Sequence, residues 1–216
     1  MRKIVLGALL GLGLISACTS TSDEKKSLPI LGPREPKVTM VDGQPKVDTV
    51  YHSIPDFAFL DQDSQMVTPQ TVANKIYVAD FFFTSCPSIC PKMKSQMLRV
   101  YEKYKDNPRV ALLSHSIDPT HDTVAVLREY ADRLGVSSKT WHFLTGDKDT
   151  ILDLAQKHYL TSALESNEAP GGFEHSGAFL LIDEKRRIRG HYDGTNEQEV
   201  DKLMQDMELL LQEKTK

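Results

Sequence analysis

The fold of this chain is decided by one stretch, Lys75-Ile-Tyr-Val-Ala-Asp-Phe-Phe-Phe-Thr-Ser-Cys86-Pro-Ser-Ile-Cys90-Pro-Lys-Met93. Its first half consists of β-branched and aromatic residues, which is typical of a strand buried on both faces. Its second half holds two cysteines four positions apart, and Pro91 suits the first turn of a helix, because a proline there loses no hydrogen bond. A helix N-terminus favours thiolates through its free N–H groups and partial positive charge. The stretch therefore predicts a strand and then a helix, with two thiols at the junction that can form a disulfide or bind one soft metal ion.

The first 17 residues have the pattern of a signal peptide. Arg2 and Lys3 form a charged start, residues 4–15 an apolar core, and small residues follow. The apolar run is too short for a comfortable membrane span. Ile15-Ser16-Ala17-Cys18 matches the bacterial lipoprotein signal, in which the cysteine becomes the lipidated N-terminus. We therefore expect residues 1–17 to be a lipoprotein signal peptide and Cys18 to be lipidated, which would anchor the chain to a membrane of the cell envelope, facing the periplasm or the exterior. An ordinary secretory signal is the alternative.

The rest of the chain divides into a linker and one domain. Residues 18–50 are rich in Ser, Thr, Lys, Pro and Asp with little periodicity, so we expect a lipid-anchored tether and arm. Residues 51–213 are long enough for one domain with its own core. Loss of Arg2 and Lys3 would take the formal net charge from −4 to −6, and no basic cluster suggests nucleic acid as a partner. Without Cys18 two cysteines remain, as one local pair in a compartment where disulfides persist.

Beyond the first strand the pattern alternates between helices and strands. The expected elements are a helix at about 91–105, a strand at 109–117, a helix up to Leu134 ended by Gly135, a strand at 141–144, a helix at about 147–159, a loop at 161–174, a hairpin of 176–183 and 188–192, and a helix at 196–212. This order predicts an α/β protein with a thioredoxin-like fold, in which helices flank a mixed central sheet. A site in such a sheet lies at the carboxyl ends of the parallel strands, where the cysteines are.

At these positions the chain resembles the SCO/SenC family of exported copper-handling proteins with a thioredoxin fold, over residues 54–211. The resemblance rests on Phe83-Thr-Ser-Cys86-Pro-Ser-Ile-Cys90-Pro91, Ser116-Ile-Asp-Pro119 with Asp122-Thr123, Leu144-Thr-Gly146, and Glu174-His175-Ser176 before a strand. In that family two cysteines and a histidine bind one copper ion, which goes to the CuA centre of cytochrome c oxidase subunit II. The resemblance thus implies Cys86, Cys90 and His175 as ligands of Cu(I)/Cu(II). It also implies subunit II, or another copper-receiving exported protein, as the recipient.

Two residues near the implied site depart from the family pattern. Ser88 and Glu174 stand where many relatives carry aspartate, which changes the surroundings of the ligands more than the ligands themselves. The ligand set itself is apt, because Cu(I) prefers thiolates and imidazole in low coordination number. A structural zinc ion would require four ligands, and three are obvious here. Glu174 or a backbone carbonyl is expected to orient the free imidazole nitrogen of His175.

The main alternative is an enzyme, a thiol–disulfide oxidoreductase acting on exported proteins. Cys86 would attack a target disulfide and Cys90 would resolve the mixed disulfide. Oxidoreductases of this kind carry two residues between the cysteines, whereas this chain has three. A redox or copper sensor is a third reading that the sequence does not separate from a chaperone.

Other candidates for chemistry have simpler structural explanations. His115 falls within a predicted strand and is expected in the core, as are Met93 and Met97 at helical spacing. Asp118 and Asp122 are expected to cap the second helix.

Overall fold

The computed structural model describes residues 27–166, 168–169 and 171–213. The predicted signal peptide, Cys18 and the first part of the tether lie outside these residues. None of the helices in the described ranges is long and apolar enough to cross a membrane.

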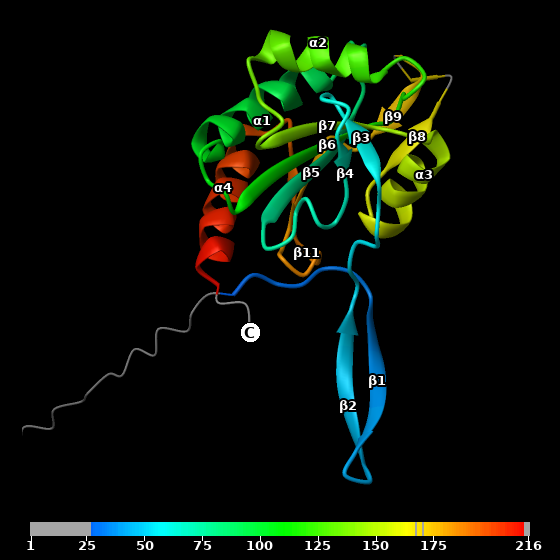
Figure 1. Ribbon diagram of the computed structural model, residues 1–216, viewed down its shortest axis with the longest axis vertical. Coiled ribbons are helices and arrows are strands. Elements are labelled where there is room, and N and C mark those ends of the chain that lie inside the picture. The colour runs from blue at the N-terminus through cyan, green and yellow to red at the C-terminus, as the bar shows by residue number, and fades with distance from the viewer. Residues whose placement is uncertain (1–26, 167, 170, 214–216) are drawn as a thin grey trace, which may run out of the picture.

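A seven-stranded mixed sheet forms the centre of the domain, in the order β11-β10-β5-β6-β7-β3-β4 (Figure 1). The three central strands β5, β6 and β7 are parallel, and the strands beside them on both edges run antiparallel. The strands are β3 (Phe59–Asp61), β4 (Met66–Val67), β5 (Ile76–Phe82), β6 (Val110–Ser116), β7 (Trp141–Thr145), β10 (Ala178–Ile182) and β11 (Ile188–Asp193). This is the predicted thioredoxin-like architecture.

Helices cover both faces of the sheet. Those that flank it are α1 (Cys90–Tyr104), α2 (Val124–Leu134), α3 (Lys148–Asp153), continued by a π-helix (Leu154–His158), and α4 (Glu197–Gln212). On one face Tyr130 of α2 packs on Phe82 and Phe143. On the other face Tyr159, which follows the π-helix, packs on Phe81. Because Phe81 and Phe82 are neighbours on one strand, they point to opposite faces and show that both are covered.

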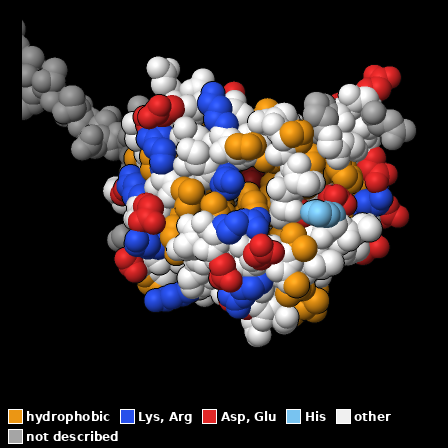
Figure 2. Space-filling view, turned by 90° about the horizontal axis from the view of Figure 1, so that it is seen from above, with side chains coloured by type: hydrophobic (Ala, Val, Ile, Leu, Met, Phe, Trp, Pro, Cys, Tyr) orange, Lys and Arg blue, Asp and Glu red, His pale blue; other side chains and the backbone are white. Residues whose placement is uncertain are grey.

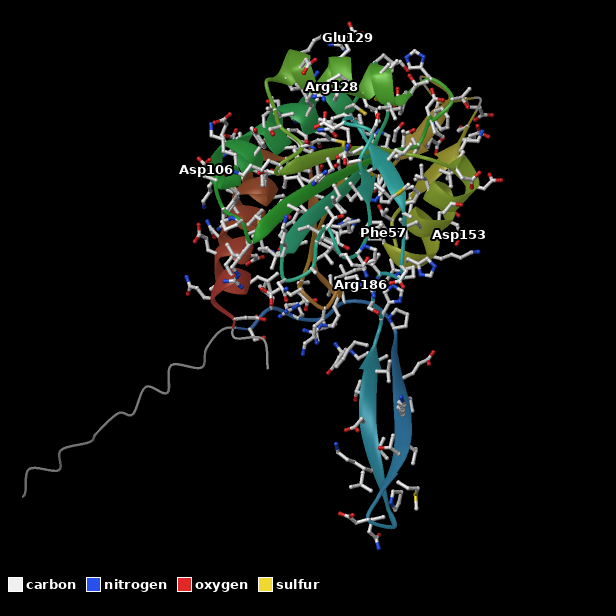
Figure 3. All side chains as sticks on the ribbon, in the orientation of Figure 1. Phe57, Asp106, Arg128, Glu129, Asp153 and Arg186 are labelled. Carbon is white, nitrogen blue, oxygen red and sulfur yellow. The ribbon has the colours of Figure 1, made fainter. Side chains whose placement is uncertain are left out.

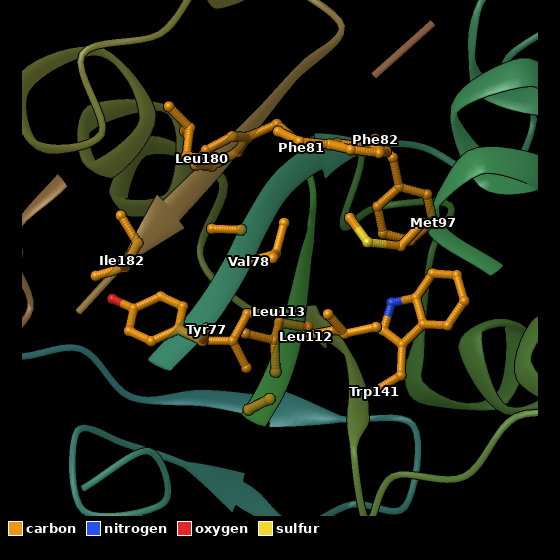
Figure 4. Close-up of a cluster of buried hydrophobic side chains, with 14 of the residues drawn as sticks. Tyr77, Val78, Phe81, Phe82, Met97, Leu112, Leu113, Trp141, Leu180 and Ile182 are labelled. Carbon is orange, nitrogen blue, oxygen red and sulfur yellow. The ribbon is translucent and has the colours of Figure 1, made fainter. Parts of the chain in front are cut away.

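The two central strands have no exposed face. All seven residues of β5 and all seven of β6 are buried, as the run of β-branched and aromatic residues predicted. Figure 4 shows Tyr77, Val78, Leu112 and Leu113 of these strands packed between Ile182 of β10 and Trp141 of β7. After β5 the chain leaves the sheet through the loop of residues 83–89 and enters α1.

Several elements differ from the sequence-based expectation. Residues 161–174, predicted as a loop, overlap a short antiparallel pair of β8 (Ala163–Glu165) and β9 (Phe173–His175). Three-residue strands carry too little periodicity to be recognised without their partner. The third helix changes from α-helix to π-helix after Asp153.

The expected arm is a two-stranded hairpin. It consists of β1 (Arg34–Val41) and β2 (Gln44–Tyr51), and it stands away from the domain in Figure 1. Residues 28–33, ahead of it, are not a free tether. Arg189 donates hydrogen bonds to the carbonyls of Leu28 and Pro29, and the N–H of Leu31 donates to Ile188.

His115 lies in the core, as predicted. Its ring stacks on Phe81 with 5.0 Å between centroids and meets Phe59 and Tyr159 at 5.8 and 5.5 Å. Neither ring nitrogen has a hydrogen-bond partner among the described residues. Burial lowers the pKa of His115 to about 4, because a charged imidazolium would lose its hydration in this aromatic pocket.

We expect His115 to make the domain sensitive to acid. The unfolded chain takes up a proton near pH 6.5, whereas folded His115 does so only near pH 4. Stability therefore falls as pH decreases between these values, by about 3 kcal/mol in total. His115→Leu should flatten this part of the curve in urea unfolding measured from pH 8 to pH 4.5. Leu113→Ala, in the same strand, should lower stability equally at all pH values, and an unchanged slope in His115→Leu would contradict the assignment.

Candidate metal centre

Two thiols and one imidazole meet where β5 gives way to α1. The sulfur atoms of Cys86 and Cys90 and a ring nitrogen of His175 all lie within 4.8 Å of one another. Cys90 Sγ is 3.3 Å from His175 Nε2. Both cysteines are buried and His175 is partly buried. The structure thus brings together the three ligands that were predicted from positions 85 residues apart in the chain.

The start of α1 places Cys90 at the positive end of a helix. Cys90 is the first residue of α1 and Pro91 follows it, as the sequence suggested. No acidic residue occupies the first turn, so nothing in that turn opposes the partial positive charge of the helix end. The loop ahead of the helix turns tightly, and the N–H of Cys86 donates to the carbonyl of Phe83 at 3.3 Å.

A buried carboxylate holds this loop. Asp122 has no exposed surface and accepts hydrogen bonds from the N–H of Thr84 at 3.0 Å, from the Thr84 hydroxyl, and from the Ser116 hydroxyl at 2.6 Å. The expectation that Asp122 caps α2 is wrong, because the cap is Thr123, whose side chain accepts from the N–H of Val126. Asp122 and Thr123 are both residue types that cap helices, so the sequence does not separate them. In the structure the chain bends after β6, and this bend turns Asp122 inward.

His175 presents one nitrogen to the thiols and leaves the other without a partner. It is the last residue of β9 and pairs with Ala163 of β8. Its ring meets the edge of Phe83, with centroids 6.0 Å apart. Nδ1 is buried, and the described residues offer it no hydrogen bond. Glu174 does not orient the ring as expected, because its side chain accepts from the Ser166 hydroxyl instead.

The two thiols differ in acidity. Burial raises the pKa of Cys86, but hydrogen bonds from the Cys90 thiol and the Ser88 hydroxyl outweigh burial and leave the pKa below its ordinary value. Burial and the neighbouring Cys86 raise the pKa of Cys90 well above its ordinary value. Burial also lowers the pKa of His175 to about 4, so its imidazole is neutral and its lone pair is free near pH 7. Cys86 is therefore the easier of the two thiols to ionise, and a second thiolate at Cys90 requires a cation beside it.

The remaining candidates occupy other places in the fold, although Met93 and Met97 line the same small buried cavity as Cys90. Met93 and Met97 are buried in the core, as predicted. His121 is exposed in the turn before α2. The metal centre lies at the carboxyl end of β5, away from the arm. Figure 2, seen from above the view of Figure 1, looks onto that end, where hydrophobic side chains are exposed between lysines and arginines.

Known proteins are similar to this chain in sequence and in architecture. The SCO1/SenC family model matches residues 46–212. The SCO1 homolog of Bacillus subtilis is 28% identical over 167 residues, which covers 76% of this chain and 86% of that protein. The structure of BsSco, described as a member of the Sco family of cytochrome c oxidase assembly proteins, has a TM-score of 0.66 at 27% identity and covers 76% of this chain and 95% of its own.

A copper-bound relative has the same fold. The structure of Bradyrhizobium japonicum ScoI with copper bound has a TM-score of 0.55 at 24% identity, and the match covers 71% of this chain and 98% of that one. The family match spans both cysteines, His175 and the whole central sheet. The chain therefore belongs to the SCO1/SenC family.

Proposed function

We propose that this chain is an exported, membrane-anchored copper protein that delivers copper to the CuA centre of cytochrome c oxidase subunit II or to another exported copper-receiving protein. The observation that carries the proposal is the convergence of Cys86, Cys90 and His175 within 4.8 Å. The copper-bound Bradyrhizobium japonicum protein and the oxidase-assembly role of BsSco support the choice of metal and pathway.

The donor set suits Cu(I). Thiolates and a neutral imidazole are soft ligands, and the ion accepts the low coordination number that three residues supply. Across the described ranges no fourth cysteine, histidine or carboxylate joins the cluster, as a closed zinc site would require. A bound cation would also allow Cys90 to release its proton, because the positive charge offsets the burial of a second thiolate. The orphaned Nδ1 of His175 leaves the ring held only by packing and by the contact of Nε2 with Cys90, which suits a ligand that must let its metal go.

A thiol–disulfide oxidoreductase is the second candidate, and the unequal thiols favour it. The more acidic Cys86 would attack a target disulfide as thiolate, forming a mixed disulfide and releasing one target thiol. Cys90 would then attack Cys86, lose its proton and release the second target thiol. The target gains two electrons and the pair becomes a disulfide. Copper stoichiometry on the reduced protein, measured beside disulfide exchange with a model substrate, distinguishes the two functions.

Removing either thiol should abolish tight copper binding. Cys86→Ser and Cys90→Ser each take away a soft ligand. We expect the copper affinity to fall by more than the roughly 100-fold that is lost when a residue contacting a ligand is replaced. Competition with a Cu(I) chelator measures the affinity. The control is Ser85→Ala, an exposed neighbour outside the ligand set. One-to-one tight binding retained in either serine variant would show that the site is elsewhere.

His175→Ala should weaken copper binding by at least about tenfold, since it removes one ligand of three. It should also shift the visible absorption of the Cu(II)–thiolate form, which would depend on the complete set of ligands. His121→Ala, on the exposed turn, is the matched control. A spectrum identical to that of the unmodified protein would remove His175 from the ligands.

Cys18→Ser should release the protein from membranes. Lipidation of Cys18 supplies the proposed anchor, so fractionation of cells should move the variant from the membrane to the soluble fraction. Cys86→Ser is the control and should stay with the membranes. Membrane attachment of Cys18→Ser equal to that of the unmodified chain would contradict the lipoprotein assignment.

A further inference from the structure

The arm formed by β1 and β2 is unusual because it buries almost nothing. Every side chain in the two strands is exposed except Thr39 and Tyr51, which are partly buried. Nine large hydrophobic side chains are exposed in the described part of the chain, and five of them belong to the arm. A lone two-stranded hairpin is at best marginally stable in water. The arm therefore carries apolar surface that a partner would stabilise. Figure 3 shows its side chains projecting into open space on both sides.

The two faces of the arm differ in polarity. Val38 pairs with Val47 and Met40 with Pro45, and residues paired across an antiparallel ladder share a face. Val38, Met40 and Val47 are 61%, 68% and 64% exposed. From residue 36 to residue 49 this apolar face has no charged side chain; its members are Pro36, Val38, Met40, Pro45, Val47 and Thr49. The opposite face holds the charged residues Glu35, Lys37, Lys46 and Asp48, of which the last two form an ion pair at 3.1 Å, together with Val41 and Val50.

One proline in each strand weakens the outer edges of the arm for pairing with a further strand. The turn residues Asp42 and Gly43 both have positive φ, 51° and 76°, as in a two-residue type I′ hairpin. In such a hairpin Val41 and Gln44 exchange hydrogen bonds, so the next pair, Met40 and Pro45, directs its N–H positions outward. Pro36 and Pro45 stand at outward positions of the two strands and have no N–H to offer. Val38, Met40, Val47 and Thr49 keep outward N–H groups, so the edges are weakened rather than closed. Packing on the apolar face is the contact that needs none of these groups.

Charge and shape favour a second copy of this chain as that partner. The arm has three cationic and three anionic side chains, so identical arms do not repel one another and neither lipid headgroups nor a highly charged protein gains attraction. The turn carries Asp42 at its tip, and the apolar face has no tryptophan or phenylalanine, unlike segments that enter the membrane interface. A twofold dimer packs the same patch of each copy on itself, and a face without charged side chains does so without charge repulsion.

We propose that two copies of the chain associate by packing the apolar faces of their arms against each other, as a small four-stranded sandwich. Eight residues at about 3.3 Å each and two strands give a face of about 260 Å², well below the roughly 800 Å² per partner of a stable complex. The association is therefore weak and depends on local concentration. The inference does not rest on copper binding, since the arm lies away from the metal centre.

Cross-linking tests the contact on the full chain. In a Cys86→Ser, Cys90→Ser background, Val47→Cys places a thiol on the apolar face and Asp48→Cys places one beside it on the polar face. A bis-maleimide matching the roughly 10 Å between stacked sheets should give at least about tenfold more dimer with Val47→Cys. The Cys86→Ser, Cys90→Ser chain without a further cysteine is the control, because it measures the dimer formed through Cys18 alone. Adding Val38→Lys should remove the product, because the contact would bury an unpaired charge.

Three results would overturn the proposal. One is equal dimer yield from both faces, or none at the highest soluble concentration. Another is a Val47→Cys product whose yield Val38→Lys leaves unchanged. The third is protection of Val47→Cys by phosphatidylcholine vesicles without dimer formation, which would assign the face to lipid. Thermal unfolding of each variant confirms that the domain is intact, since the substituted side chains are exposed.

Discussion

Burial of β5 on both faces is the constraint on which the metal centre depends. A strand covered on both faces can continue only by leaving the sheet at its end, and here it leaves into a seven-residue loop, 83–89, that ends in α1. Asp122 fixes that loop by accepting from Thr84, and the carboxylate in turn is held by Ser116 at the end of β6. Because β5 and β6 are neighbouring parallel strands, their carboxyl ends bring these groups together. The thiols are thus positioned by the sheet rather than by each other.

The chemistry of the site follows from the different cost of forming a thiolate at each of its two cysteines. Hydrogen bonds favour the thiolate of Cys86, and burial opposes that of Cys90. Such a pair is relieved either by a cation, which permits the second thiolate, or by oxidation to a disulfide, which removes both charges. His175 adds a neutral imidazole, which can bind a metal ion but takes no part in a disulfide. Its proximity to Cys90 therefore tilts the site towards metal binding over disulfide chemistry.

The parts of this structure that could be predicted are those determined by local pattern. The buried run before Cys86, and Pro91 just after Cys90, gave the strand, the helix and the place of the thiols. His175 was identified through family resemblance, because its position depends on the pairing of β8 with β9, whose strands are too short to show a pattern. Asp122 was misassigned as a cap for a similar reason, since its partner Thr84 is 38 residues away. The hairpin of residues 34–51 alternates polar and apolar residues, but prolines within both strands hid that pattern.

The N-terminal segment and the metal centre lie at opposite ends of the domain. Arg189, almost fully buried, pairs with Asp183 and Glu213 and holds the carbonyls of Leu28 and Pro29. This network keeps the N-terminal segment at the amino end of β5, while Cys86 lies past its carboxyl end, about 20 Å away for seven residues of strand. The arm projects from the same end as the N-terminal segment (Figure 1). A contact made by the arm, or an attachment made through the residues before Ser27, therefore leaves the metal centre open to an incoming protein.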